Sequence, residues 1–152
     1  NVPEAGLPAV IHGDYHLDNT LASPLEPQIL AIIDWELATV GDPYMDVALM
    51  LMFWGEYRTQ QPPAFTALQS VSRRSGVISR RELAGRWSES VGRPLHHMNF
   101  YMALAFWRLA AIIEGAYGLF VAGQLTTDYA RGLEYDVPAL LAEAERAAKG
   151  DW

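Results

Sequence analysis

The segments His12-Gly13-Asp14-Tyr15-His16-Leu17-Asp18-Asn19 and Ile33-Asp34-Trp35-Glu36 decide the fold of this chain. Asp14 and Asn19 lie five positions apart in a predicted loop. Asp34 directly follows an apolar run, residues 29–33, which has the length and composition of a buried strand. A strand that ends at an acidic residue places a carboxylate at the strand's end, where catalytic and binding sites are commonly located. We therefore expect Asp14, Asn19 and Asp34 to converge.

These residue types meet the needs of phosphoryl transfer to an alcohol. The reaction requires bound Mg²⁺, a carboxylate that accepts the proton of the alcohol, and oxygen ligands for the metal. Asp14 would supply the base, and Asn19 and Asp34 would supply the metal ligands. The kinase catalytic loop has this layout, H-x-D-x-x-x-x-N followed by a second Asp.

The segment from His12 to Asn19 resembles the catalytic loop of the aminoglycoside phosphotransferase and choline kinase-like family, which are small-molecule kinases related to protein kinases. The segment from Ile33 to Glu36 resembles the metal-binding segment of that family, and residues 41–48, GDPYMDVA, resemble the start of its next helix. Within the family, the likeness points to kinase domains that stand alone in bacteria or are fused to acyl-CoA dehydrogenases. Residues 106–115 resemble a later helix of those domains.

The resemblance implies an α+β, mainly helical fold for residues 1–152. This would be the C-terminal lobe of a protein-kinase-like fold, with a small β-hairpin that carries the catalytic and metal-binding loops. It implies transfer of the γ-phosphate of ATP or GTP, with Mg²⁺, to a hydroxyl of a small molecule. His12 and Asp46 would support the site, Asp46 by bracing the catalytic-loop backbone. For Glu36, a contact to a second metal and a cap on the next turn stay equally open.

The acceptor stays open between an aminoglycoside, a hydroxy-acyl or CoA-linked compound, and another metabolite. Cationic aminoglycosides would suit a pocket with acidic walls, whereas the likeness to dehydrogenase-fused domains favours a hydroxy-acyl or CoA-linked acceptor. We prefer a metabolite that is not an antibiotic.

The basic residues indicate that this chain is one lobe of a larger kinase. None precedes Arg58, and Lys149 is the single lysine. A kinase of this class holds ATP with a lysine on a strand that precedes the catalytic loop. We expect an N-terminal nucleotide lobe that is missing here, by design or by proteolysis, so that the fragment alone is inactive. Its exposed cleft face would then favour self-association.

Composition excludes several other classes of protein. Half of the residues are hydrophobic, so a packed core is expected rather than disorder. The absence of cysteine excludes disulfides and thiolate metal sites and, with no visible signal peptide, fits a cytoplasmic protein. A net charge of −7 argues against a nucleic-acid partner. Arg108 and Glu114 interrupt the most apolar segment, so we expect no membrane span.

Local patterns predict three strands in one small sheet, followed only by helices. The strands are residues 9–11, 20–22 and 28–33, and the helices are residues 44–54, about 62–75, about 80–91, 98–123 and 137–148. Asp42 is the predicted N-cap of the first helix, with Pro43 as its first residue, and Ser79 with Glu82 forms a capping box.

Side-chain placements follow from the same patterns. The aromatics of the 98–123 helix are expected in the core; they are Phe100, Tyr101, Phe106, Trp107, Tyr117 and Phe120. Arg108 is expected to be a paired buried charge, with facing an anionic substrate as the less favoured option. Glu143, Glu145 and Arg146 are expected on the solvent-exposed face of the last helix.

Two other functions stay open. One is a kinase-like binding or regulatory module without catalysis. The other is a metal-dependent hydrolase that uses His12, Asp14, His16 and Asp34, and it would bind a transition metal through its imidazoles. A glycine-rich loop and a strand lysine upstream would favour the kinase, whereas stoichiometric zinc or manganese would favour the hydrolase.

Overall fold

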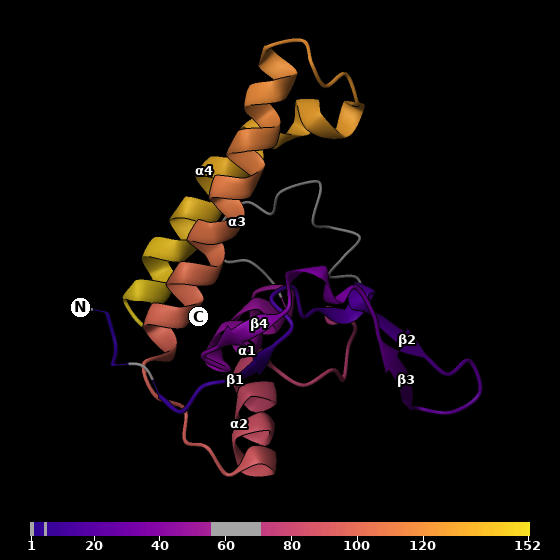
Figure 1. The fold of residues 1–152 in the computed structure, drawn as a ribbon, viewed down its shortest axis with the longest axis vertical. Helices are drawn as coiled ribbons and strands as arrows, with labels where there is room; N and C mark the ends of the chain where they lie inside the picture. The colour runs from indigo at the N-terminus through magenta and orange to yellow at the C-terminus, as the bar shows by residue number, and fades with distance from the viewer. Residues whose placement is uncertain (1, 5, 56–70) are drawn as a thin grey trace.

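The computed structural model describes residues 2–4, 6–55 and 71–152 (Figure 1). The first part of the chain forms short elements: β1 (Ala9–Ile11), the 3₁₀ turn η1 (Leu17–Asn19), β2 (Thr20–Ala22), β3 (Ile29–Ile32), η2 (Trp35–Leu37) and β4 (Thr39–Gly41). Four α-helices follow in the described part: α1 (Tyr44–Met52), α2 (Arg80–Val91), α3 (Met98–Val121) and α4 (Asp128–Ala148). The fold is mainly helical with small sheets, as the sequence predicts.

The strands form two antiparallel pairs rather than one sheet. β1 pairs with β4, with Ala9 opposite Gly41, and β2 pairs with β3, with Thr20 opposite Ile32. The β2–β3 hairpin extends away from the helices in Figure 1. The prediction of a single three-stranded sheet was therefore wrong, and β4 was missed. Three residues are too few to carry a periodic signal, and the partner of β4 lies far upstream in the sequence.

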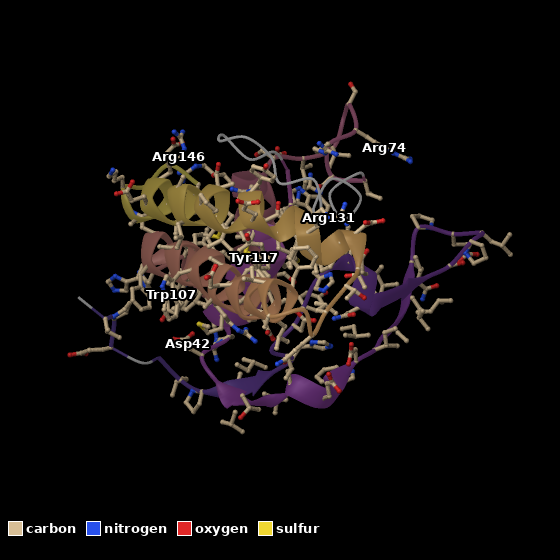
Figure 2. The ribbon with its side chains drawn as sticks, turned by 90° about the horizontal axis from the view of Figure 1, so that it is seen from above. Asp42, Arg74, Trp107, Tyr117, Arg131 and Arg146 are labelled. Carbon is tan, nitrogen blue, oxygen red and sulfur yellow. The ribbon has the colours of Figure 1, made fainter. Side chains whose placement is uncertain are left out.

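The hydrophobic core lies among the helices. α4 runs back along α3, and α1 packs against the same helix (Figure 1). Figure 2 views the α3–α4 pair from above, with side chains filling the space between the two helices. The large side chains with almost no exposure come from three helices: Leu51 and Met52 of α1, Met102 and Phe106 of α3, and Leu133 and Leu140 of α4.

Two helix starts were predicted from their caps. At α2, Ser79 accepts a hydrogen bond from the backbone N–H of Glu82, and the reciprocal bond completes the predicted capping box. At α1, Asp42 Oδ1 accepts from the N–H of Tyr44 at 3.0 Å. Pro43 precedes the helix rather than being its first residue, so this start was misplaced by one position.

α4 departs most from its predicted form. It begins at Asp128, where the Thr127 side chain accepts from the N–H of Ala130, and it continues through Pro138. The predicted start near Pro138 was wrong because a proline inside a helix removes one backbone hydrogen bond without always ending the helix. Glu143 was expected in solvent but is only 2% exposed.

The predicted placements in α3 were partly wrong. Trp107, expected in the core, is 56% exposed, and Figure 2 labels its position on α3. Arg108 is half-buried, and its hydrogen-bond partner is a backbone carbonyl rather than a carboxylate. By length and composition alone α3 could cross a membrane, a test that core helices of soluble proteins also pass. Here α3 packs against α1 and α4.

The helix predicted for about residues 62–75 falls mostly outside the described residues. Its described end, residues 71–75, consists of turns and a bend.

Candidate active site

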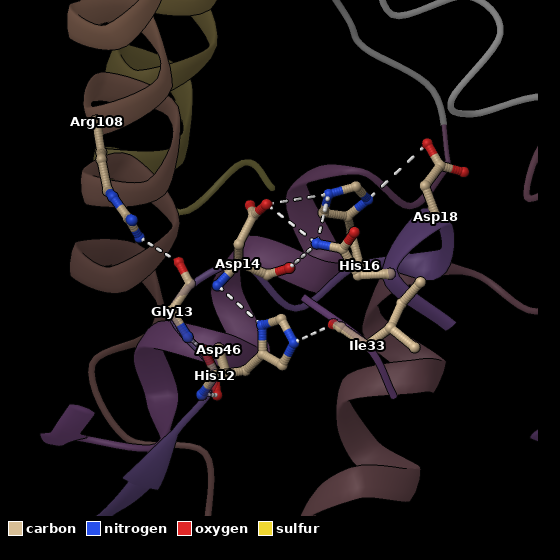
Figure 3. Close-up of polar contacts among 9 residues, drawn as sticks. His12, Gly13, Asp14, His16, Asp18, Ile33, Asp46 and Arg108 are labelled. Atoms are coloured by element: carbon tan, nitrogen blue, oxygen red, sulfur yellow. Dashed lines mark hydrogen bonds and ion pairs between the residues drawn. The ribbon is translucent and has the colours of Figure 1, made fainter. Parts of the chain in front are cut away.

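Asp46 holds the beginning of the catalytic loop. This first-turn residue of α1 is half-buried, and its two carboxylate oxygens accept backbone N–H bonds from His12 at 2.6 Å and from Gly13 at 2.9 Å (Figure 3). Hydrogen bonds to an ionised carboxylate are stronger than neutral ones. The arrangement is the one that a bracing role for Asp46 requires.

His12 ties the loop to the end of β3. Its Nε2 lies 2.8 Å from the carbonyl oxygen of Ile33, and the N–H of Asp14 donates to its Nδ1 at 3.2 Å. These two contacts assign the proton to Nε2, because Nδ1 must accept. The ring is 3% exposed and lies 4.7 Å, centroid to centroid, from the ring of Trp35.

That geometry removes His12 from the set of metal ligands that the hydrolase hypothesis needs. Both of its ring nitrogens already have partners, and the ring is buried. In the part of the chain that the structure describes, no group of three or more His, Cys, Asp or Glu side chains gathers as a metal cluster. The described geometry thus gives the hydrolase hypothesis no support.

Gly13 occupies a position that only glycine fits. Its φ is +84°, and a Cβ atom there would lie 2.5 Å from the carbonyl oxygen of Leu37. Its own carbonyl oxygen accepts a hydrogen bond from Arg108 Nη1 at 2.9 Å (Figure 3). A residue from the middle of α3 therefore contacts the loop directly beside Asp14.

Asp14 and Asn19 are brought together by the loop, as predicted from their spacing. The amide nitrogen of Asn19 donates to the backbone oxygen of Asp14 at 2.8 Å and lies 3.1 Å from its carboxylate Oδ2. The backbone oxygen of Asn19 accepts from the N–H of Ile33 at 2.9 Å, which places Asn19 beside the residue preceding Asp34. Asn19 is buried, whereas the Asp14 side chain remains 39% exposed.

Asp34 stands in a strained backbone conformation. Its φ of 64° and ψ of 57° are left-handed, a region that non-glycine residues enter at a cost of about 1–3 kcal/mol and mostly at functional sites, although Asp tolerates it better than most. The residue is exposed, and its carboxylate forms no hydrogen bond or ion pair within the described residues. Glu36 is likewise exposed, on η2, and its two possible roles stay open.

The donor set at Asn19 and Asp34 fits Mg²⁺. The amide nitrogen of Asn19 is engaged by Asp14, while its Oδ1 accepts no hydrogen bond from the described residues. This oxygen and the free carboxylate of Asp34 are hard ligands of the kind that Mg²⁺ prefers.

His16 lies between the two acids of the loop, with its side chain only 14% exposed. Its Nε2 lies 3.6 Å from Asp14 Oδ2, its Nδ1 lies 4.0 Å from Asp18 Oδ2, and its ring packs on Phe53 at 4.7 Å. The sequence favoured a structural or substrate-facing role for His16 over metal binding, and only the folded loop shows its position beside Asp14.

A pocket of about 330 Å³ opens at Asp14. Its lining includes His16 and Arg108, and the remaining residues are apolar or aromatic: Leu37, Leu49, Phe53, Leu109, Ile112 and Tyr129. Burial, followed by the charge of Asp136, raises the pKa of Tyr129. A larger hollow of about 710 Å³, which Arg81 and Trp152 help to line, contains no catalytic-loop residue, and one of about 460 Å³, which His12 and Tyr15 help to line, does not include Asp14. We therefore place the candidate site at the pocket that Asp14 lines.

Sequence reasoning missed most of this pocket. The acids of the motif were found from their spacing, but Phe53, Ile112 and Tyr129 come from three separate elements and carry no local signal. The described lining does not have the acidic walls that an aminoglycoside acceptor would suit, since Asp14 is its single carboxylate.

Comparisons with known proteins show the family of this chain. Residues 1–76 match the model of the phosphotransferase enzyme family, APH. The chain is 32% identical over 132 residues to acyl-CoA dehydrogenase family member 10 of Mus musculus and 33% identical over 121 residues to family member 11 of Homo sapiens. These matches cover 84% and 78% of this chain but only 12% and 15% of the relatives.

A solved structure provides a further comparison. The crystal structure of a Ralstonia eutropha protein named as an aminoglycoside phosphotransferase superposes with a TM-score of 0.74 at 31% identity. The match covers 94% of this chain and 43% of that one. The fold is therefore kinase-like, and the chain belongs to the phosphotransferase enzyme family.

Proposed function

We propose that this chain carries the catalytic and acceptor-binding part of a small-molecule kinase, which transfers the γ-phosphate of ATP or GTP to a hydroxyl group. The observation that supports this most is the pairing of Asp14 with Asn19, whose backbone contacts the residue before Asp34. This arrangement puts a half-exposed carboxylate beside an oxygen-rich metal position, the combination that phosphoryl transfer needs.

Asp14 is the proposed base. The acceptor hydroxyl donates a hydrogen bond to its carboxylate, and its oxygen forms a bond to the γ-phosphorus. The bond from that phosphorus to the bridging oxygen of the β-phosphate breaks, and the nucleoside diphosphate leaves with that electron pair. The hydroxyl proton passes to Asp14. The hydrogen bond from Asn19 holds the carboxylate in place for this step.

Asn19 Oδ1 and the carboxylate of Asp34 are the proposed ligands of Mg²⁺. When bound, Mg²⁺ would neutralise charge on the nucleotide phosphates. The left-handed backbone of Asp34 ends the extended course of the chain two residues after β3. In this proposal Asn19 and Asp34 bind the nucleotide through Mg²⁺, whereas Asp14 contacts the acceptor hydroxyl.

Binding of the nucleotide requires protein elements beyond those in residues 1–152. Kinases of this class grip ATP with a lysine and a glycine-rich loop on a separate lobe. We propose that such a lobe completes the enzyme and that residues 1–152 form the C-terminal lobe. The enzyme is proposed to act in the cytoplasm.

The test is Asp14→Asn in the complete enzyme with its N-terminal lobe, assayed for Mg²⁺-dependent release of nucleoside diphosphate in the presence of a panel of hydroxyl compounds. Loss of the base should lower kcat by about 10²–10⁴-fold while nucleotide binding persists. The control is Asp18→Asn, because Asp18 lies on the solvent side of His16. Near-normal turnover of Asp14→Asn would refute the proposal.

A further inference from the structure

We propose that Arg108 determines the acceptor class by binding a negatively charged group on an otherwise apolar, hydroxyl-bearing acceptor. The inference rests on the proposed function and names the substrate class of the same pocket. The guanidinium group of Arg108 lines the Asp14 pocket and contacts the residue before the proposed base.

One nitrogen of the Arg108 guanidinium group is held by the protein, and the other two are available to bind a ligand. Nη1 donates to the carbonyl oxygen of Gly13 at 2.9 Å (Figure 3), while Nη2 and Nε donate to no atom of the described residues. Arg108 forms no ion pair with a described carboxylate, although the chain carries a net charge of −7. A half-buried arginine whose protein partner is a neutral carbonyl retains most of its capacity to bind an anion.

The rest of the pocket indicates the body of the acceptor. Apart from Asp14, His16 and Arg108, its described lining is aliphatic or aromatic. Such walls favour hydrocarbon rather than a sugar with many hydroxyl groups, because unmatched polar groups lose hydration there. The acceptor thus combines an apolar body, one hydroxyl at Asp14 and one anionic group at Arg108.

The same geometry disfavours polycationic acceptors such as aminoglycosides. Asp14 is the single carboxylate in the described lining, and as the base it must remain available to the hydroxyl. Arg108 adds repulsion for every ammonium group that enters. An enzyme that accepts polycations would need acids where this pocket has Leu37, Phe53 and Ile112.

The contact with Gly13 also makes the anion site rigid. Arginine loses little freedom on binding when its planar group is already held, so the free donors are preorganised. Because Gly13 precedes Asp14, the same contact sets the position of the anion relative to the base.

The test uses three probes of equal chain length: octanoate, octylamine and octanol. Binding to the purified protein is measured by isothermal titration calorimetry at constant ionic strength. Octanoate should bind more tightly than octylamine. Arg108→Gln should weaken octanoate binding at least about tenfold, since a hydrogen-bonded charge pair is lost, and should leave octanol binding unchanged. Arg108→Lys keeps the charge, so its affinity for octanoate should lie between those of the wild type and Arg108→Gln. The control is Arg131→Gln, an exposed arginine on α4 (Figure 2).

Two outcomes would overturn the inference. One is equal octanoate affinity in the wild type and Arg108→Gln. The other is an Arg108→Gln effect on inorganic phosphate without one on octanoate, which would assign Arg108 to the transferred phosphoryl group instead. If Arg108→Gln fails to fold, two other measurements still test the inference. They are the wild-type preference for octanoate over octylamine and the octanoate affinity of Arg108→Lys.

These titrations contain no nucleotide and no turnover. A failure of the Asp14→Asn test would remove the proposed reaction and leave an anion-binding pocket. A negative result of the octanoate test would refute the proposed acceptor class without affecting the proposed reaction.

Discussion

Asp136 is a buried carboxyl group on α4 that the proposed reaction does not use, and we predict that Asp136→Asn stabilises the fold. Its exposure is 0%, and neither carboxylate oxygen has a hydrogen-bond partner among the described residues. A charge in such a position is costly unless it is paired. Asparagine has nearly the same size and is neutral at every pH, so the substitution removes the charge without opening a cavity.

The size and direction of the effect follow from the pKa. Burial raises the pKa of Asp136 from 3.8 to about 6. Each pKa unit corresponds to about 1.4 kcal/mol, so ionisation of Asp136 destabilises the folded state by ~3 kcal/mol at neutral pH. The folded state holds the proton more tightly than the unfolded state. The penalty is therefore absent below pH 3.8, grows between pH 3.8 and about 6, and is constant above that range.

Urea denaturation from pH 4 to pH 8 measures this difference. The free energy of unfolding of Asp136→Asn should exceed that of the wild type by ~3 kcal/mol at pH 7, and the two should approach each other near pH 4. Asp128→Asn, at a fully exposed site on the same helix, is the matched control and should follow the wild type. A difference that stays constant across this pH range, or a variant less stable at pH 7, would refute the reasoning.

Two further predictions concern the catalytic loop. Gly13→Ala should lower the free energy of unfolding by at least about 1 kcal/mol, because the added Cβ meets a backbone oxygen at a positive φ; Gly85→Ala, in the open interior of α2, should instead raise it by about 0.5–1 kcal/mol. Asp46→Asn should lower it by about 2 kcal/mol, since one of the two backbone N–H groups loses its carboxylate acceptor. Urea denaturation checks both, and a Gly13→Ala variant as stable as Gly85→Ala, or an unaffected Asp46→Asn, would contradict them.

The parts of the fold that were predicted correctly carry local signals. The Ser79 and Glu82 capping box acts over one helical turn, and the spacing of Asp14 and Asn19 places both in one loop. β4 was missed because its pairing with β1 joins segments that are far apart in sequence and only three residues long. No local sequence pattern predicts such a pairing.

The side-chain errors have a different cause. Glu143 lies on a face of α4 where the polarity pattern predicts solvent and the structure places the core, and Asp136, seven residues earlier, is buried on the same helix. Trp107 shows the reverse error on α3. In both helices the partners decide which face is buried, and those partners are not adjacent in sequence. The contact of Arg108 with Gly13, at the edge of the proposed acceptor pocket, is another long-range feature of this kind.

The contact between Arg108 and Gly13 also has a consequence for how the protein is made. Arg108 follows Gly13 by 95 residues. A ribosome that adds about 5–20 residues per second synthesises that interval in roughly 5–20 s. The catalytic loop therefore leaves the ribosome well before the helix that anchors it exists. During this interval Asp46, made much earlier, is its nearer anchor. The candidate active site is thus set in two stages, and a nascent chain halted before α3 would hold Asp14 in a loop supported from one side only.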